Sequence, residues 1–434
     1  MSGTAENAPS THLTPNIPLT DESPSFANKL LFFLLLSGPP KLRLRDPSAS
    51  LNDEIDWVIV LQLIVWGIAG CWVLLNYSYT RRRRTATSQS SSLPTLSVLL
   101  IALLSLSIFF SEAPVFCAFK VYQLAITFAF VMLFTRRFGI NETLQNLFLG
   151  CGILTLADIV AAFVMPDLVF VESELGSMRF RGDLIAQTGC VSVIGLILLL
   201  TAKSDLPKKW FFFWAMTFGS VLVLSLMRTS YLVLLFVFLL AALRRPAIPV
   251  LRRVATISML ALPLVADMLI TALNAERKAE DIWTLSERVG LWSYLIDATL
   301  DKGPYLGLGY FAATRIYAPE FNPNLGTAHS AFMEIYVGGG FVTLIAFLLI
   351  WMVLSWKVLR LYFTRSGKTE FAIVALFCAA LFLNAIGGEL QADPSGFCFW
   401  CVIAAVAVLP HQHPSLALPA PSPHGRGASV PQGA

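Results

Sequence analysis

The chain has 434 residues, of which 56% are hydrophobic and only 13% are Asp, Glu, Lys or Arg. An ordinary soluble domain has roughly 25% charged residues, and the mean hydropathy of this chain is +0.69. A soluble globule of this size could not cover its surface with so few polar groups. The composition excludes a cytosolic enzyme, a disordered protein and a disulfide-stabilised secreted domain. It indicates an all-α polytopic integral membrane protein. The net charge of +4 is small, so the positions of the charges matter more than their sum.

In chain order, residues 1–25 form a polar N-terminal tail that contains neither Lys nor Arg. A signal peptide has a basic start and an apolar middle, so we do not expect one here. Apolar segments of about 20 residues follow and predict membrane-spanning helices. We expect eleven or twelve, depending on the weaker segment 26–37. The others are 56–75, 93–111, 115–134, 145–165, 183–201, 210–227, 229–243, 252–273, 332–356, 371–388 and 396–410.

The segment 210–243 is divided into two spans because Arg228 interrupts it, and a charge in mid-bilayer is costly. The spans thus occupy residues 26–273 and, for the last three, 332–410. Residues 411–434 are rich in Pro, Ala, Ser and Gly, and we expect a disordered C-terminal tail.

Lys and Arg gather in every second predicted loop, and the positive-inside rule places those loops in the cytoplasm. Two of the alternate loops, 111–114 and 388–395, contain neither residue type. The division of 210–243 is needed for this alternation to hold along the whole chain. The basic loops are those with Arg81–Arg84, Arg136 and Arg137, Lys203 to Lys209, Arg244 to Arg253, and Lys357 to Lys368.

Residues 274–331 form one long loop on the opposite, periplasmic side, and the loop is not of low complexity. Ser286 can cap a short helix whose apolar face we expect to include Val289, Trp292, Leu295 and Ile296, and Lys302-Gly303-Pro304 ends that helix. Long ordered loops more often have a functional role than serve only to connect two helices.

Four arginines lie where the orientation rule disfavours them, on the external side: Arg179, Arg181, Arg228 and Arg288. Each one by itself is most simply explained as a snorkelling or solvated side chain. Together they indicate an anionic ligand at the outer membrane boundary, because guanidinium groups bind phosphate oxygens in bidentate fashion.

His329 is the one histidine in the body of the chain, and its ordinary pKa near neutrality suits a general base. A structural histidine at a helix start is the simpler reading of that residue alone. Glu334 lies about 140° around the helix from His329, so we expect it to pack or cap rather than to pair with the histidine. Asp301 and Glu320 are the alternative acid–base candidates in the same loop.

Other features of the sequence are weaker indications of function. Asp158, Asp267 and Lys120 fall in apolar segments, where an ionisable residue is by default a functional candidate. Asp267 and Lys120 are close to predicted span ends, which weakens that reading for both. Gly338–Gly340 predict close helix packing or a break in a span. Cys398 and Cys401 have a C-x-x-C spacing without a second pair, and four of the five histidines lie in the tails, so we expect no metal site and no cofactor.

Several of these residues resemble the signature of bacterial O-antigen ligases and of O-antigen and exopolysaccharide polymerases. The family pattern in the long loop runs R-x-x-x-W, then P-x-x-G-x-G-x-x-F, then H-N-x-x-L-E. The matching residues here are Arg288 and Trp292; Pro304, Gly307, Gly309 and Phe311 (offset by one position); and His329 and Glu334. Ser225-Leu-Met-Arg228-Thr229 and Arg179-Phe-Arg181-Gly182 resemble two further family motifs. The sequence departs from the pattern at Ser330, where Asn is usual, and at Met227, where Ser is usual.

The resemblance implies a lipid-linked-glycan glycosyltransferase of the bacterial inner membrane. Such an enzyme moves a glycan from an undecaprenyl diphosphate carrier to a sugar hydroxyl at the periplasmic face, in lipopolysaccharide or exopolysaccharide biosynthesis. His329 would be the general base, and Arg228 and Arg288 would bind the diphosphate. Substrate binding would involve Arg179, Arg181, Trp292, Gly307, Gly309 and Glu334. No metal or nucleotide would be required.

The acceptor that the resemblance implies is lipid A–core for a ligase or another lipid-linked repeat for a polymerase. Its other expected partners are the lipid bilayer and other polysaccharide assembly or export proteins; we expect no nucleic acid. A secondary transporter or lipid-linked oligosaccharide flippase is the main alternative, and it predicts internal repeats and broken helices at the bilayer midplane. A non-catalytic scaffold is a third possibility, which leaves the external Arg and His residues unexplained.

Overall fold

A computed structural model gives the fold of the chain. It describes residues 23–38, 57–83, 92–172, 178–180, 188–225, 227–244, 288–322, 325–365, 367–386, 388, 390 and 393–412. The predicted span 252–273, the proposed capping residue Ser286, and Arg181 lie outside the described residues, as do most of the two predicted tails.

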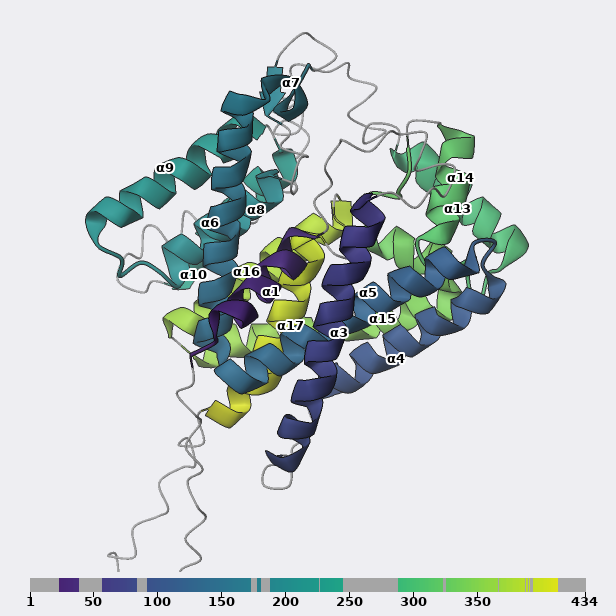
Figure 1. Cartoon of the computed structure of the whole chain (residues 1–434), viewed down its shortest axis with the longest axis horizontal. Coiled ribbons are helices and arrows are strands. Elements are labelled where there is room, and N and C mark those ends of the chain that lie inside the picture. Colours follow the sequence, from purple (N-terminus) through teal and green to yellow (C-terminus); the bar gives the residue numbers. More distant parts are fainter. Residues whose placement is uncertain are drawn as a thin grey trace, which may run out of the picture.

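The described part of the chain is almost entirely helical (Figure 1). Its first half contains α1 (Phe26–Ser37), α3 (Trp57–Arg83), α4 (Ser92–Leu106), the 3₁₀ turn η2 (Ser107–Phe110), α5 (Pro114–Phe138), α6 (Ile140–Val164), α7 (Pro166–Val169) and α8 (Thr188–Thr201). Its second half contains α9 (Lys208–Ser225), α10 (Arg228–Arg244), α13 (Arg288–Lys302), α14 (Ala312–Phe321), α15 (Ala331–Thr364), α16 (Lys368–Ile386) and α17 (Pro394–Gln412).

The predicted spans other than 252–273 each coincide with one of these helices. Six helices, namely α3, α4 with η2, α5, α6, α15 and α16, are long and apolar enough to cross a bilayer. The predicted division at Arg228 is confirmed, since α9 ends at Ser225 and α10 begins at Arg228. The weaker segment 26–37 is helical, but its twelve residues rise only about 18 Å, against a hydrocarbon core of about 30 Å. The protein is an all-α polytopic membrane protein.

A small antiparallel hairpin was not predicted from the sequence. It pairs β1 (Phe170–Glu172) with β2 (Met178–Phe180), and Phe170 lies opposite Phe180. Phe180 is buried in a small cluster with Val169 and Val221 of α9. Three-residue strands are too short to give an alternating pattern that stands out among longer apolar segments.

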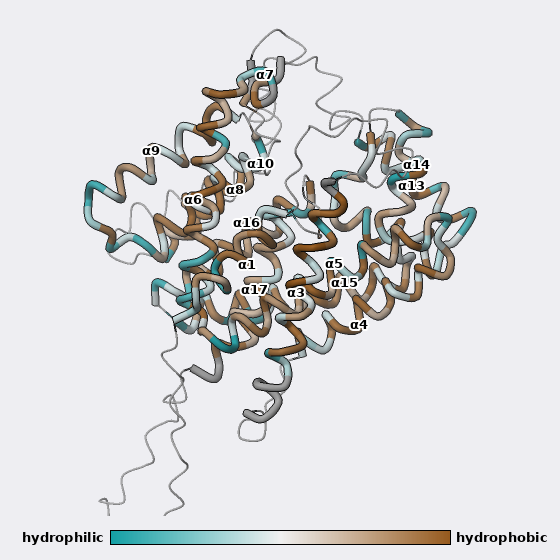
Figure 2. Tube along the Cα trace, viewed as in Figure 1, coloured by the Kyte–Doolittle hydropathy of each residue, from teal (hydrophilic) through white to brown (hydrophobic). Residues whose placement is uncertain are grey.

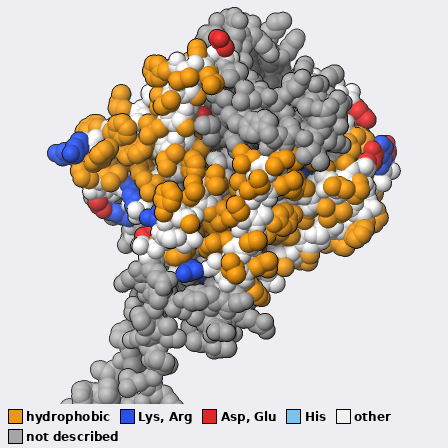
Figure 3. Space-filling view, in the orientation of Figure 1, with side chains coloured by type: hydrophobic (Ala, Val, Ile, Leu, Met, Phe, Trp, Pro, Cys, Tyr) orange, Lys and Arg blue, Asp and Glu red, His pale blue; other side chains and the backbone are white. Residues whose placement is uncertain are grey.

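Hydrophobic residues run along most of the helices (Figure 2), and apolar side chains cover much of the described part of the face seen in Figure 3. Helix α17 lies at the centre and is buried along nearly its whole described length, in contact with α5 and α16. On the outside, Leu75 and Phe163 are 77% and 85% exposed. Exposed apolar side chains at this density are expected where the solvent is lipid rather than water.

Several predicted cytoplasmic loops meet at one end of the helical body, which we call the basic end. Lys368 forms an ion pair with Asp205 at 2.6 Å, and Arg244 donates a hydrogen bond to the carbonyl of Arg365. Because α15 ends and α16 begins there, the start of α15 and the end of α16 lie at the opposite end. Helix α10 also ends there, so its first residue, Arg228, belongs to that opposite end too.

Candidate functional site

Helices α13 and α14, with the start of α15, enclose a small hydrophobic cluster that is separate from the main core. Leu291 and Leu295 of α13 lie one helical turn apart and face this cluster. Of the predicted apolar face, Leu295 is buried here, whereas Val289 is 47% exposed. Ala313 and Tyr317 supply the α14 side of the cluster. The cluster gives this part of the predicted long loop a packed interior, in which Leu325 and Ala328, shortly before α15, take part.

His329 lies in the short segment that joins α14 to α15, and it has a left-handed backbone conformation with φ 52°. This conformation is unfavourable for a residue that has a side chain, so the surrounding structure must impose it. The Oγ1 atom of Thr327 lies 3.4 Å from Nδ1 of the histidine ring. His329 is only half-buried, which keeps its side chain accessible.

Two hydrogen bonds hold the backbone of Ala328, the residue before His329. Trp292 of α13 donates through Nε1 to the Ala328 carbonyl at 2.8 Å. The Ala328 N–H donates to Oε1 of Glu334, also at 2.8 Å. Since the Ala328 carbonyl belongs to the peptide bond that leads to His329, both contacts restrict where the histidine can point. We call this arrangement the Ala328 clamp.

The carboxylate of Glu334 is fully buried, and its other oxygen, Oε2, accepts a hydrogen bond from Thr314 of α14 at 2.8 Å. A buried carboxylate needs such donors, because desolvation without compensation is costly. The expectation that Glu334 packs or caps is therefore confirmed: it caps the segment that carries His329. The predicted roles of Trp292 and Glu334 in substrate binding stay predictions.

Gly307 and Gly309 allow residues 304–311 to pack directly on the backbone of α15. Leu308 and Gly309 donate N–H groups to the carbonyls of Val337 and Gly338, at 2.9 and 3.0 Å. Both glycines have positive φ, and a Cβ on Gly307 would lie 2.4 Å from the carbonyl carbon of Gly338.

Gly340 of α15, which approaches the same loop at Tyr305, is also constrained. Gly340 has φ 72° and ψ −173°, so it breaks the helical path of α15, and a Cβ there would meet the Tyr305 carbonyl carbon at 2.3 Å. The predicted break is confirmed at Gly340, whereas the close packing at Gly338 is against the loop residue Tyr310 rather than against another helix. The protein's own backbone occupies the break, since Phe341 donates to the carbonyl of Pro304 at 2.9 Å.

Two of the predicted arginines, Arg228 and Arg288, lie at the same end of the helical body as His329. Arg288 is the first residue of α13, and its guanidinium donates to the carbonyl of Ile386, the last residue of α16. Arg228 is the first residue of α10, which packs antiparallel to α16 with Phe236 against Phe382, ring centroids 5.4 Å apart. Arg288 therefore contacts the C-terminal residue of α16, and Arg228 begins the helix that packs beside α16.

The second arginine motif is described only in part. Arg179 is the middle residue of β2, whose neighbour Phe180 is buried against Val221 of α9. Its partner in the motif, Arg181, lies outside the described residues. The structure thus places the strand that carries Arg179 against α9, the helix that precedes Arg228.

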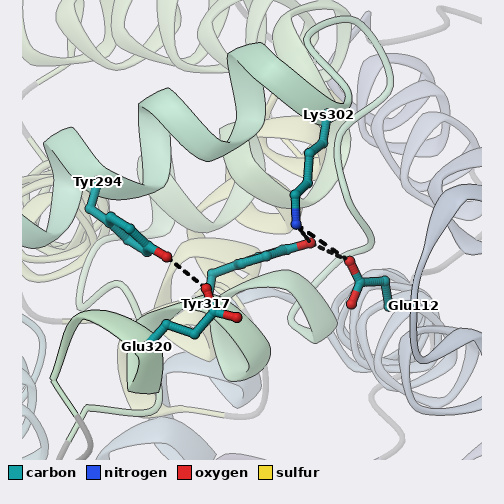
Figure 4. Close-up of polar contacts among 5 residues, drawn as sticks. All are labelled: Glu112, Tyr294, Lys302, Tyr317 and Glu320. Carbon is teal, nitrogen blue, oxygen red and sulfur yellow. Dashed lines mark hydrogen bonds and ion pairs between the residues drawn. The ribbon is translucent and has the colours of Figure 1, made fainter.

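A polar network joins α13 and α14 to the turn before α5 (Figure 4), with Lys302 and Glu112 exposed and Tyr317 buried. Tyr317 donates to Glu112, and the ammonium of Lys302 lies 2.9 Å from the Tyr317 hydroxyl. Burial and the hydrogen bond to Glu112 raise the pKa of Tyr317 above its usual range, and the bond to Tyr317 raises the pKa of Lys302. One turn further along α14, Tyr294 of α13 donates to Glu320 at 2.6 Å.

The two alternative acid–base candidates thus have separate environments. Glu320 is engaged by Tyr294, and Asp301 lies exposed in the last turn of α13. Neither takes part in the Ala328 clamp. Within the described ranges, no group of three or more His, Cys, Asp or Glu side chains could hold a metal ion.

Sequence reasoning missed Thr314, which lies between the motif-bearing stretches at 303–311 and 328–334. The signal that could have found it is weak: a threonine at the third position of a short helix, on the face that meets α15. Lys120 was found, and the structure places its ammonium 5.5 Å from the ring centroid of Phe311, at the start of α14.

Residues 210–348 of the chain match the family model described as O-antigen ligase. A comparison with curated proteins finds no match. The matched segment begins in α9 and ends in α15, so it includes Arg228, Arg288, the Ala328 clamp and His329. Residues 210–348, about a third of the chain, are therefore similar to the O-antigen ligase family.

Proposed function

We propose that the protein is a glycosyltransferase that moves a glycan from undecaprenyl diphosphate to a sugar hydroxyl at the periplasmic face of the inner membrane. The observation that carries this proposal is the Ala328 clamp. It holds His329 in a strained conformation beside α13, the helix that starts with Arg288. Strained backbone is typically retained at functional sites.

In this mechanism His329 removes the proton of the acceptor hydroxyl, and Nε2 is the nitrogen that we assign, since Nδ1 faces Thr327. The acceptor oxygen then forms a bond to the anomeric carbon as the bond from that carbon to the diphosphate oxygen breaks. The leaving diphosphate keeps the electron pair, and the anomeric centre is inverted. A general base of this kind typically contributes about 10²- to 10⁴-fold in rate.

Arg288 and Arg228 stabilise the negative charge that develops on the leaving diphosphate. Both begin helices at the end of the body where His329 lies, and an arginine stays protonated at any working pH. The positive charge comes from the protein, so the proposed reaction is metal-independent. The donor's polyprenyl chain would lie among the apolar helices.

The sidedness of the charges supports the periplasmic assignment. The ion pair of Lys368 and Asp205 and the contact of Arg244 with Arg365 lie at the basic end, which the positive-inside rule places in the cytoplasm. His329, Arg228 and Arg288 are at the other end. The break in α15 gives no support to a transporter, because Gly340 packs against Tyr305 rather than lining a cavity.

The test is transfer by the purified protein from a defined lipid-linked donor to an acceptor glycan. Arg288→Ala is expected to abolish product, whereas Arg360→Ala, at an exposed position near the basic end, should leave the rate unchanged. Offering lipid A–core and a second lipid-linked repeat in turn separates ligase from polymerase. Near-normal transfer by Arg288→Ala at an equal protein level would contradict its role.

A further inference from the structure

A tyrosine in the first turn of α10 ties the start of that helix, and so Arg228, to the end of α9. The hydroxyl of Tyr231 lies 3.1 Å from the carbonyl oxygens of both Leu222 and Val223, in the last turn of α9. The last four carbonyls of a helix have no partner within it, and at a membrane such groups need a donor from elsewhere in the protein. Tyr231 supplies its one proton to this pair, so α10 caps the end of α9.

The first turn of α10 is also tied to the start of α8. Ser230 is fully buried, and its hydroxyl donates to the carbonyl of Gly189 at 3.1 Å. A Cβ on Gly189 would lie 2.6 Å from the sulfur of Met227, so a glycine is needed there for the residue before Arg228 to pack directly on α8. The backbone is therefore fixed on both sides of Arg228.

The end of α9 is itself held in place by the strand that carries Arg179. The side chain of Val221, the residue before Leu222, is buried with Phe180 of β2 in one small cluster. Along its length, α9 also packs on α8 and α6 (Figure 1). The turn of α9 that accepts from Tyr231 is thus a fixed support, and a hydrogen bond to it defines where α10 begins.

We propose that Tyr231 is a positioning residue of the donor site, which holds Arg228 in the direction that a diphosphate requires. The proposal rests on the proposed function, in which Arg228 binds the diphosphate of the donor. A guanidinium binds phosphate oxygens in bidentate fashion only from a suitable direction, so the helix that begins with Arg228 has to start at a fixed place. Tyr231 acts through Arg228 and makes no contact with the donor.

A double-mutant cycle on donor binding separates this role from a merely structural one. Native mass spectrometry gives the Kd of the full-length protein for undecaprenyl diphosphate, a sugar-free probe. We expect Tyr231→Phe and Arg228→Gln each to raise this Kd about tenfold, the size of one charge-assisted hydrogen bond. The double variant should bind at most about twofold more weakly than Arg228→Gln, because the effects of residues that act as one unit do not add.

The matched control is Tyr362→Phe. The hydroxyl of Tyr362 in α15 donates to the carbonyl of Leu240 at 3.0 Å, near the basic end of α10. Tyr362→Phe and Tyr231→Phe each remove one hydrogen bond from a tyrosine to a carbonyl of a membrane helix, so both should lower the unfolding midpoint by a similar amount. Only Tyr231→Phe should raise the Kd for undecaprenyl diphosphate. Ser230→Ala, which removes the bond to α8, should raise it in the same non-additive way.

Transfer kinetics give a second readout. Tyr231→Phe should raise the donor KM about tenfold and leave the acceptor KM unchanged, because the segment before His329 is held by α13, α14 and α15 rather than by α10. An equal rise in both KM values would show that the whole periplasmic end is displaced, and would contradict the positioning of Arg228.

The remaining outcomes separate this proposal from the proposed function. An unchanged Kd in Tyr231→Phe, a loss that multiplies with that of Arg228→Gln, or an equal loss in Tyr362→Phe would overturn the positioning role alone. Wild-type binding by Arg228→Gln would instead refute the donor site of the proposed function. Non-additive binding in a protein without transfer activity would refute glycosyl transfer and leave the positioning of Arg228 standing.

Discussion

Oε1 of Glu334 accepts a hydrogen bond from the backbone N–H of Ala328 at 2.8 Å, across the turn that carries His329. Through this contact, Glu334 in the first turn of α15 holds the segment that precedes the helix. The other carboxylate oxygen is held by Thr314, so Glu334 connects α14, α15 and the histidine segment.

Glu334→Gln should lower kcat and leave the donor KM unchanged. The amide keeps one acceptor oxygen, so either Thr314 or Ala328 loses its partner, at a cost of about 1–3 kcal/mol for a buried group. We expect kcat to fall about 10- to 100-fold, because a small displacement of a catalytic group has effects of this size. Glu320→Gln is the control, since that exposed carboxylate contacts Tyr294 and not Ala328. A change in KM alone, with kcat intact, would refute the positioning role.

Trp292→Phe removes the donor to the Ala328 carbonyl and keeps most of the ring. The expected loss of stability is about 1 kcal/mol, typical of one hydrogen bond, measured as the shift of the thermal unfolding midpoint in detergent. Transfer should slow at saturating donor and acceptor. If Trp292 instead bound substrate directly, KM would rise and the unfolding midpoint would stay in place.

Gly307→Ala should destabilise the fold strongly. The new Cβ would lie 2.4 Å from Gly338 at a positive φ, so both strain and overlap oppose it. Gly326→Ala is the matched control, because a Cβ added there would have no other atom within 4 Å. We expect a lower unfolding midpoint and reduced protein in the membrane for Gly307→Ala only. Equal behaviour of the two variants would show that the contact between the loop and α15 is dispensable.

The network of Tyr317, Lys302 and Glu112 should make the loop less stable at alkaline pH. The pKa values of Tyr317 and Lys302 are raised in the fold, so the folded state favours their protonated forms. This stability is present below about pH 10, the ordinary tyrosine pKa, and is lost as the pH rises through the higher folded values. Tyr317→Phe should therefore show a smaller loss of unfolding midpoint between about pH 8 and pH 11 than the wild type. An identical loss would exclude Tyr317 as a contributor.

The positions of the membrane helices could be predicted from the sequence, because apolar length is a strong local signal. The sidedness inferred from the placement of Lys and Arg stays a prediction. Arg228 marked the division of 210–243, and Lys302-Gly303-Pro304 marked the end of α13. His329 was found because it is the one histidine in the body of the chain. These predictions rest on residue types that stand out in an apolar sequence: a charged arginine, which is costly in a bilayer, a Gly-Pro pair, which ends a helix, and a single histidine.

The contacts that position His329 could not be predicted. The Ala328 clamp joins Trp292, Thr314 and Glu334, which lie on three helices. Hydrogen bonds to backbone atoms leave little trace in composition or periodicity. The pairing of Gly307 with Gly338 is equally hidden, because a glycine in the sequence does not indicate which backbone will approach it.

The most direct measurement is transfer by purified His329→Gln, with saturating donor and acceptor and with donor binding measured on the same sample. The account predicts a loss of about 10²- to 10⁴-fold in rate, the contribution of a general base, with donor binding and the unfolding midpoint unchanged. Transfer within a few-fold of the wild-type rate would contradict the assignment of His329 as the base.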